Sequence, residues 1–266
     1  KYTVLRYGQK LQIKDYQITL YPAGHILGSA QVLIEKNKHR LVITGDYKVG
    51  RDDTCQNFKL IKCDTLITEA TFGLPIFQHP DPKEEIKKLI NSVKKNKSSC
   101  HIIGAYALGK AQRIMNLLRL NNYNDKIYIH GSLEKLCNYY KEQKINIGLF
   151  EKVVSKDRSF YEGKIIIAPP SALKDRWSRR FPNPIICMAS GWMTVKQRAK
   201  QRGIELPLVI SDHSDWNELL DTIKKSKAKN ILVTHGQEDA LVYYCKLNNL
   251  ISKPLSIQGR SDEEIE

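Results

Sequence analysis

Four short apolar runs in this chain are each followed, within three residues, by an acidic residue or a histidine. The residues after the four runs are Asp46, Glu69, the pair Asp212 and His213, and His235. The carboxyl ends of strands in α/β sheets share one edge, so we expect these side chains to converge there. His25, in a glycine-containing loop between two further predicted strands, is a fifth candidate. The pattern predicts a sheet with a cluster of polar ligands along one edge.

Imidazole and carboxylate groups without thiolates favour zinc or manganese over an iron-sulfur cluster or calcium. Any one of these residues alone could be a structural residue at a strand end, but the recurrence of all five after apolar runs favours a metal site. The six cysteines are scattered and contain no Cys-x-x-Cys pair. We therefore expect them to be reduced and mostly buried.

The distribution of apolar residues changes at about residue 80. Before it, predicted strands at residues 11–13, 17–21, 30–35 and 41–43 form a meander. After it, candidate strands at residues 102–103, 127–129, 165–167 and 185–187 alternate with helical segments, which predicts a parallel sheet. Asp81 and Pro82 have the character of an N-cap and a first helical residue. The last part is predicted to hold strands at residues 208–210 and 231–233, with a helix between them.

The formal net charge is +15. The last six residues hold four acids and no base, so the rest of the chain carries +19. A basic excess of this size indicates a polyanionic partner, and nucleic acid is favoured over a membrane surface because no amphipathic anchor is visible. No run approaches the roughly 18 apolar residues of a membrane span, so we expect a cytoplasmic protein without membrane contact.

At these residues the sequence resembles the β-CASP branch of the metallo-β-lactamase superfamily, and most closely its bacterial DNA-ligase-associated exonucleases. The similar stretches run from Ala23 to Gln31, Gly45 to Lys48, Thr68 to Pro75, Ala189 to Met193, Ser211 to Trp216 and Thr234 to Gly236. The resemblance implies an α/β fold in which a metallo-β-lactamase αββα sandwich is interrupted by a parallel α/β β-CASP domain. The expected boundaries are residues 1–74 and 207–258 for the sandwich, 75–206 for the insertion and 259–266 for an acidic tail.

The resemblance also implies roles for individual residues. Residues matching His25, Asp46 and His235 bind two divalent metal ions, Zn or Mn, in that family. Asp46, Glu69 and His213 are the implied catalytic residues, with His213 protonating the leaving oxygen and Glu69 orienting it. The implied reaction is two-metal hydrolysis of phosphodiester bonds.

The implied activity is that of a DNA exonuclease in repair, with an ATP-dependent DNA ligase and a helicase as candidate partners. Two alternatives stay open: an RNA 3′-end processing or decay nuclease, and a non-catalytic nucleic-acid-binding subunit. The family also has an upstream His-x-His-x-Asp-His motif that supplies the remaining metal ligands, and this chain does not contain it. We therefore expect the first strands of the sandwich to be absent as well, and this chain alone to bind metal weakly and cleave poorly.

Five residues are predicted to contact nucleic acid: Lys110, Arg113, Ser190, Lys196 and Arg198. The stretch from Gly104 to Lys110 also fits the phosphate-loop spacing Gly-x4-Gly-Lys, but Ala111 stands where magnesium binding requires Ser or Thr. A nucleotide hydrolase is therefore disfavoured. The start of the following helix can still hold a backbone phosphate.

Two further segments, residues 174–180 and 192–202, interleave basic residues with Trp177 and Trp192. This composition is typical of a single-strand binding groove. A solvated helix face with core tryptophans explains it equally well.

Overall fold

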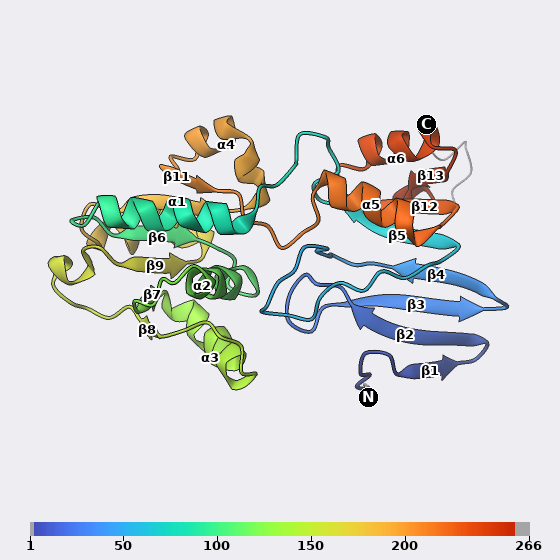
Figure 1. The fold of residues 1–266 in the computed structure, drawn as a ribbon, viewed down its shortest axis with the longest axis horizontal. Coiled ribbons are helices and arrows are strands. Elements are labelled where there is room, and N and C mark those ends of the chain that lie inside the picture. The colour runs from blue at the N-terminus through green and yellow to red at the C-terminus, as the bar shows by residue number, and fades with distance from the viewer. Residues whose placement is uncertain (1–2, 259–266) are drawn as a thin grey trace. The chain divides into compact units, whose positions relative to one another are not determined.

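A computed structural model describes residues 3–258 (Figure 1). The chain divides into two compact units. The first consists of Lys1–Gln78 and Asp212–Glu266, and the second of His79–Ser211. The predicted acidic tail at residues 259–266 lies outside the described residues.

The first unit is built on a mixed seven-stranded sheet. In spatial order its strands are β1 (Lys10–Ile13), β2 (Tyr16–Pro22), β3 (Ala30–Lys36), β4 (His39–Ile43), β5 (Thr65–Ala70), β12 (Asn230–Gly236) and β13 (Ile251–Pro254). The strands β1 to β4 pair antiparallel, which confirms the predicted meander. The pairs β4–β5, β5–β12 and β12–β13 are parallel.

One face of this sheet carries a row of fully buried residues. A row of residues in register across five strands, Thr19, Leu33, Val42, Leu66 and Ile231, has exposed fractions of 2% or less. The four apolar members of this row share a core with side chains of α5 (Trp216–Ser226) and α6 (Glu238–Leu247). The two helices therefore cover this face.

The opposite face carries a second apolar row that is only partly buried. Leu20, Val32, Ile43, Ile67 and Leu232 are also in register across the same five strands. This second row lies outside the core cluster formed with α5 and α6. An apolar row of this length is typical of a sheet face that another layer covers.

The second unit is built on an entirely parallel six-stranded sheet, as predicted. Its spatial order is β11 (Leu206–Leu208), β10 (Ile185–Ala189), β6 (His101–Gly104), β9 (Ile165–Ala168), β7 (Ile127–Ile129) and β8 (Phe150–Lys152). The helices of this unit are α1 (Pro82–Lys95), α2 (Lys110–Leu120), α3 (Glu134–Glu142) and α4 (Lys196–Gln201). Asp81 caps α1 by accepting a hydrogen bond from the Lys83 amide, as predicted.

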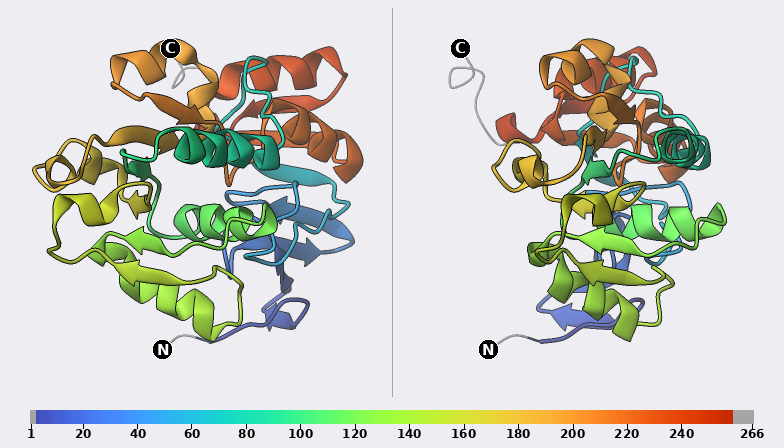
Figure 2. Two further views of the ribbon diagram at one scale, coloured as in Figure 1. Left: turned by 60° about the vertical axis from the view of Figure 1, so that its left-hand side comes forward. Right: turned by 90° about the vertical axis from the view of Figure 1, so that its left-hand side faces the viewer.

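The two faces of the second sheet are covered differently. The right-hand view of Figure 2 shows α1 and α2 on one side and the segment around residues 170–180 on the other. That segment contains two short 3-10 helices, η3 (Pro170–Leu173) and η4 (Ser178–Arg180).

The prediction of a strand at residues 208–210 is wrong. The strand β11 ends at Leu208 and pairs with β10 of the second sheet, so it does not belong to the sheet of the first unit. The Val209 amide donates to the Glu85 carboxylate, and the Ile210 amide donates to the Leu208 carbonyl. These bonds turn the chain out of the strand before it reaches His213.

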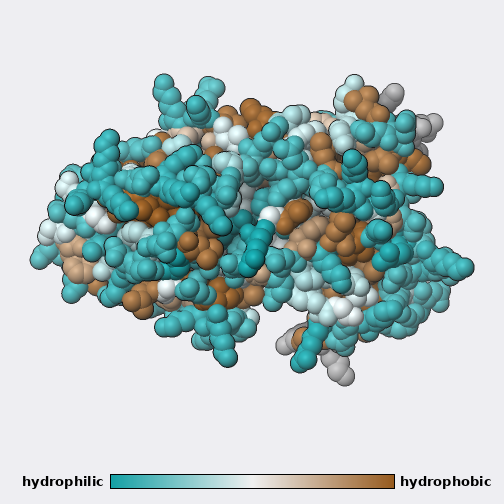
Figure 3. Space-filling view, viewed as in Figure 1, coloured by the Kyte–Doolittle hydropathy of each residue, from teal (hydrophilic) through white to brown (hydrophobic). Residues whose placement is uncertain are grey.

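The polarity of the surface, the lengths of the helices and the state of the cysteines agree with the expectations from the sequence. Figure 3 shows a mainly hydrophilic face with smaller apolar areas between polar side chains. No helix within residues 3–258 is long and apolar enough to cross a membrane. All six cysteines are free and five are buried, as expected.

Candidate metal centre

Three of the predicted site residues lie at the carboxyl ends of neighbouring parallel strands. Asp46 comes just after β4, Glu69 lies in β5, and His235 lies in β12. Because β5 is hydrogen-bonded to both β4 and β12, the carboxyl ends of the three strands share one edge. This local convergence follows from parallel pairing and is the convergence expected from the sequence.

His25 lies in the loop between β2 and β3, which is held in one conformation. The Ser29 hydroxyl accepts hydrogen bonds from the amides of His25 and Ile26. Gly24 has a φ of +72°, and an added Cβ would come within 2.3 Å of the Lys48 carbonyl oxygen. The His25 Nδ1–H donates to the Asp212 carbonyl at 2.8 Å. Since a carbonyl only accepts, this bond fixes the tautomer and leaves Nε2 available as a metal ligand.

His213 is held in the same manner by a carboxylate. Its Nδ1–H donates to the two Glu69 oxygens at 3.0 and 3.2 Å. Glu69 is 2% exposed and also accepts the Tyr47 amide at 2.7 Å. Burial alone would lower the pKa of His213, but the hydrogen bond and charge of Glu69, with the charges of Asp212 and Asp46, raise this pKa above its ordinary value.

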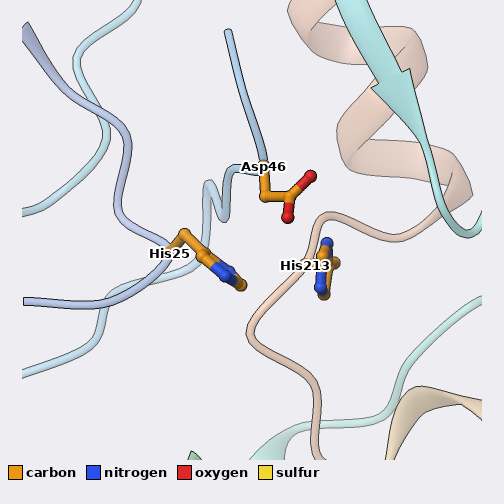
Figure 4. Close-up of side chains that lie close together, drawn as sticks. All are labelled: His25, Asp46 and His213. Carbon is orange, nitrogen blue, oxygen red and sulfur yellow. The ribbon is translucent and has the colours of Figure 1, made fainter. Parts of the chain in front are cut away.

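His25, Asp46 and His213 form a group that can hold a metal ion. One ligand atom from each lies within 4.8 Å of the others. Figure 4 shows the three side chains, which come from separate segments, around a common space. Two imidazole nitrogens and a carboxylate oxygen are a common ligand set for zinc. Because the two imidazoles donate their Nδ1–H groups elsewhere, this arrangement fits a divalent ion.

His235 approaches the same group from β12. Its Nε2 lies 3.6 Å from Asp46 Oδ1, close to the roughly 3.3 Å between neighbouring ligands of a tetrahedral zinc site with bonds of about 2.0–2.1 Å. The residue sits at a shift in the β5–β12 register and has a φ of +55°, which costs a non-glycine residue about 1–3 kcal/mol. Strain of this kind concentrates at functional sites.

A cavity of about 190 Å³ lies beside these residues. Its lining includes Asp46, Glu69 and His235 together with Ile43 and Ile67. Ile43 and Ile67 also belong to the partly buried apolar row of the first sheet. The candidate metal centre and that sheet face are therefore continuous.

The position of His213 within the candidate ligand group was not predicted from the sequence. His213 was predicted as a proton donor beside the metals, and it lies in the candidate ligand group with His25 and Asp46. The Asp212 carbonyl and the Tyr47 amide, which orient His25 and Glu69, were not predicted at all. Both are backbone groups, so no residue type marks them in the sequence.

The predicted nucleic-acid contacts all lie in the second unit. Lys110, Arg113 and Ser190 are buried, whereas Lys196 and Arg198 are exposed on α4. At the start of α2 three amides already have partners: Gly109 donates to Gln112 Oε1, Lys110 to the Leu108 carbonyl and Ala111 to the Tyr106 carbonyl. This turn therefore offers fewer amides to a phosphate than an uncapped helix start.

This chain is similar to one described protein family and to several known proteins. Residues 208–248 match a family described as "Zn-dependent metallo-hydrolase RNA specificity domain". A probable DNA ligase of Opitutus terrae is 28% identical over 88% of this chain and 23% of the ligase. Integrator complex subunit 11 of Gallus gallus is 26% identical over 86% of this chain and 46% of that protein. An RNase J-like protein of Methanocaldococcus jannaschii is 26% identical over 88% of this chain and 67% of its own length.

The chain thus spans about a quarter of the ligase and less than half of the Integrator subunit. A solved structure of an Enterococcus faecalis protein of unknown function superposes with a TM-score of 0.58. This superposition covers 96% of this chain and 65% of the other, at 12% sequence identity, so it concerns the fold alone.

Proposed function

Since the chain belongs to the β-CASP branch of the metallo-β-lactamase superfamily, we propose that it is the main part of a metal-dependent nuclease that hydrolyses phosphodiester bonds. The observation that carries this proposal is the group of His25, Asp46 and His213 at the sheet edge, with both imidazoles oriented through Nδ1. The net charge of +15 supports a polyanionic substrate.

Within this site we assign His25, Asp46 and His235 to metal binding. A bound divalent ion supplies a Lewis acid that neutralises charge on the phosphate oxygens. His213 gives its Nδ1–H to Glu69, so its Nε2 is the nitrogen that can hold a proton for the leaving oxygen. Glu69 keeps the ring in place and favours its charged form.

We further propose that the first unit is one half of an αββα sandwich and that the second unit is the β-CASP insertion. The partly buried row Leu20, Val32, Ile43, Ile67 and Leu232 supports a second sheet packed on this face. Within the described residues at most four ligands reach the site, too few for two closed tetrahedral shells. The missing layer would bring the other ligands, because the site cavity and the apolar row share Ile43 and Ile67.

Single-stranded DNA is the proposed substrate, cut from an end during repair. The similarity to a protein named a probable DNA ligase supports this choice and a ligase partner. The similarities to Integrator complex subunit 11 and to an RNase J-like protein favour RNA as the second candidate. The two candidates differ in the polymer, and the chemistry at the metal centre is the same.

The proposal is tested with the full natural polypeptide that contains this chain. The Asp46→Asn variant should lose at least about a hundredfold in cleavage rate. Asp46 belongs to the ligand group with His25 and His213, and its carboxylate also lies next to His235. Asp15→Asn, in the exposed turn between β1 and β2, is the matched control and should cleave normally. Normal cleavage by Asp46→Asn would show that the metal centre has been assigned to the wrong residues.

The role of His213 is separated from metal binding by a second variant. If it donates a proton, His213→Ala should lose about 10²–10⁴ in rate while zinc affinity, measured by calorimetry, stays within a few fold. A parallel loss of zinc affinity would instead identify His213 as a ligand alongside His25 and Asp46.

A further inference from the structure

The face of the second sheet that lies away from α1 and α2 carries a cavity of about 420 Å³. This volume lies in the range of small-ligand pockets. Its apolar lining consists of Leu173, Ile186, Met188 and Ile204, and Pro170 and Gly203 complete the wall. The two charged lining residues are both cations, Lys174 and Arg202. The cavity therefore offers an apolar floor with positive charge and no negative charge.

The chain around this cavity is strongly basic. Residues 169–204 contain eight Lys and Arg residues and a single acid, Asp175. All eight cations are exposed, and within residues 3–258 none of them forms an ion pair; they are Lys174, Arg176, Arg179, Arg180, Lys196, Arg198, Lys200 and Arg202. Cations left without acidic partners favour a polyanionic ligand.

Two of these cations lie against tryptophan rings. The Arg198 guanidinium is 4.3 Å from the centre of the Trp192 ring, and the Arg180 guanidinium is 5.2 Å from that of Trp177. Both indoles pack against the core under this face. A guanidinium that stacks on a ring keeps its N–H groups free at its edge, which suits contacts to phosphate oxygens.

The loop that carries Lys174 and Arg180 is held in place by polar contacts. The Ser178 hydroxyl lies within hydrogen-bonding distance of the Leu173 and Asp175 carbonyls. Arg158 donates from Nη2 to the Phe181 carbonyl at 2.9 Å. A rim arranged before binding loses less conformational entropy on binding than a mobile one.

We propose that this face is a binding site for single-stranded nucleic acid, with one unpaired base in the cavity and its flanking phosphates on Lys174 and Arg202. The apolar floor of Leu173, Ile186, Met188 and Ile204 can pack against an unpaired base, and the cationic rim can contact the phosphate backbone. In a duplex the bases stay paired and stacked, so they cannot enter the cavity. The identity of the polymer class rests on the proposed function. The site itself lies in the second unit and shares no residue with the metal centre.

The charge contacts are tested by equilibrium binding with EDTA present, so that cleavage plays no part. The probe is a labelled single strand of about 16 nucleotides, as DNA and as RNA. Lys174→Gln with Arg202→Gln should weaken binding about tenfold and reduce the log-log salt slope by about 1.4, because each phosphate contact on a single strand contributes about 0.7. Lys135→Gln with Lys141→Gln, on exposed positions of α3, is the matched control and should leave both values nearly unchanged.

The base contact is tested by changing the ligand. An abasic strand of the same length keeps every phosphate and should bind the natural protein about tenfold more weakly. Ile204→Phe, which fills the cavity, should lose affinity for the natural strand but not for the abasic strand. Equal binding of the natural and abasic strands by the natural protein would overturn the proposed base pocket. If an acidic peptide displaced the labelled strand as well as an unlabelled strand does, nucleic acid would be overturned as the ligand.

The binding result and the cleavage result are independent. Asp46→Asn should bind single strands as tightly as the natural protein, because Asp46 lies in the other unit. Loss of cleavage without loss of binding would therefore leave this inference intact. If Lys174→Gln with Arg202→Gln binds normally while Asp46→Asn fails to cleave, the proposed function stands and this binding site does not.

Discussion

The two faces of the seven-stranded sheet should respond very differently to the same substitution. Leu33 on β3 is 2% exposed and packs in the core with α5 and α6. Leu41 on the neighbouring β4 is partly exposed on the other face, where it pairs with Ile34. Leu33→Ala should therefore destabilise the first unit by about 3 kcal/mol, through lost burial and the cavity left behind. Leu41→Ala should cost about 1 kcal/mol, since less of its surface leaves water on folding.

The comparison requires a signal from the first unit alone. Trp216 is the tryptophan of that unit and is 9% exposed, whereas Trp177 and Trp192 belong to the second. In a background with both second-unit tryptophans changed to phenylalanine, urea unfolding followed by fluorescence reports Trp216. Equal losses from Leu33→Ala and Leu41→Ala would refute the description of one covered and one partly covered face. In the full natural polypeptide, the cost of Leu41→Ala should rise towards that of Leu33→Ala.

Three further substitutions test local features of the fold. Burial lowers the pKa of His101 from its ordinary 6.5 to about 4, so the folded chain keeps this histidine neutral while the unfolded chain binds a proton. The stability that neutral His101 contributes is present above pH 6.5 and is lost as the pH falls towards 4, by up to roughly 3 kcal/mol. His101→Leu should remove this pH dependence, which urea titrations at several pH values can measure. Gly148→Ala would place its Cβ 1.8 Å from Arg119 Nε at a φ of +71°, so it should cost about 3 kcal/mol or more in thermal unfolding. Asp215→Ala removes the carboxylate that caps α5 by accepting the Glu218 amide, and should cost about 1 kcal/mol in the same assay.

Each of these expectations has a result that contradicts it. An unchanged pH dependence in His101→Leu would show that another group is responsible. Wild-type melting of Gly148→Ala would show that Arg119 can move away from the carbonyls of Tyr123 and Asp125 without cost. An equal loss in Asp215→Asn, which keeps a capping oxygen, would remove the cap as the cause.

Much of the fold could be predicted because local patterns and tertiary structure agree. Alternation of apolar residues predicted the antiparallel β1 to β4, and Asp81 with Pro82 predicted the start of α1. The prediction of a strand at residues 208–210 was wrong because an apolar run does not reveal which sheet it joins. The carboxylate of Glu85, 124 positions away, accepts a hydrogen bond from the Val209 amide. Such a long-range bond leaves no local signal in the sequence.

The residues of the candidate site that lie at strand ends could be predicted from the sequence. Asp46, Glu69 and His235 lie at or just beyond the carboxyl ends of β4, β5 and β12, and parallel pairing brings them to one edge. The relation of His213 to His25 could not be predicted, because the Asp212 carbonyl that orients His25 comes from a loop with no regular pattern. Residue types can identify the donors, but their orientation depends on backbone groups that any residue has.

We propose that His25, Asp46 and His235, with Glu69 and His213, form the reactive centre of a metal-dependent nuclease. The most direct measurement is a gel of end-labelled single-stranded DNA and RNA, incubated with the full natural polypeptide and Mn²⁺ or Zn²⁺. We predict metal-dependent degradation that starts from one end, is faster on DNA and is absent in Asp46→Asn. Tight binding of both strands with no degradation of either would contradict the claim and identify a non-catalytic nucleic-acid-binding subunit.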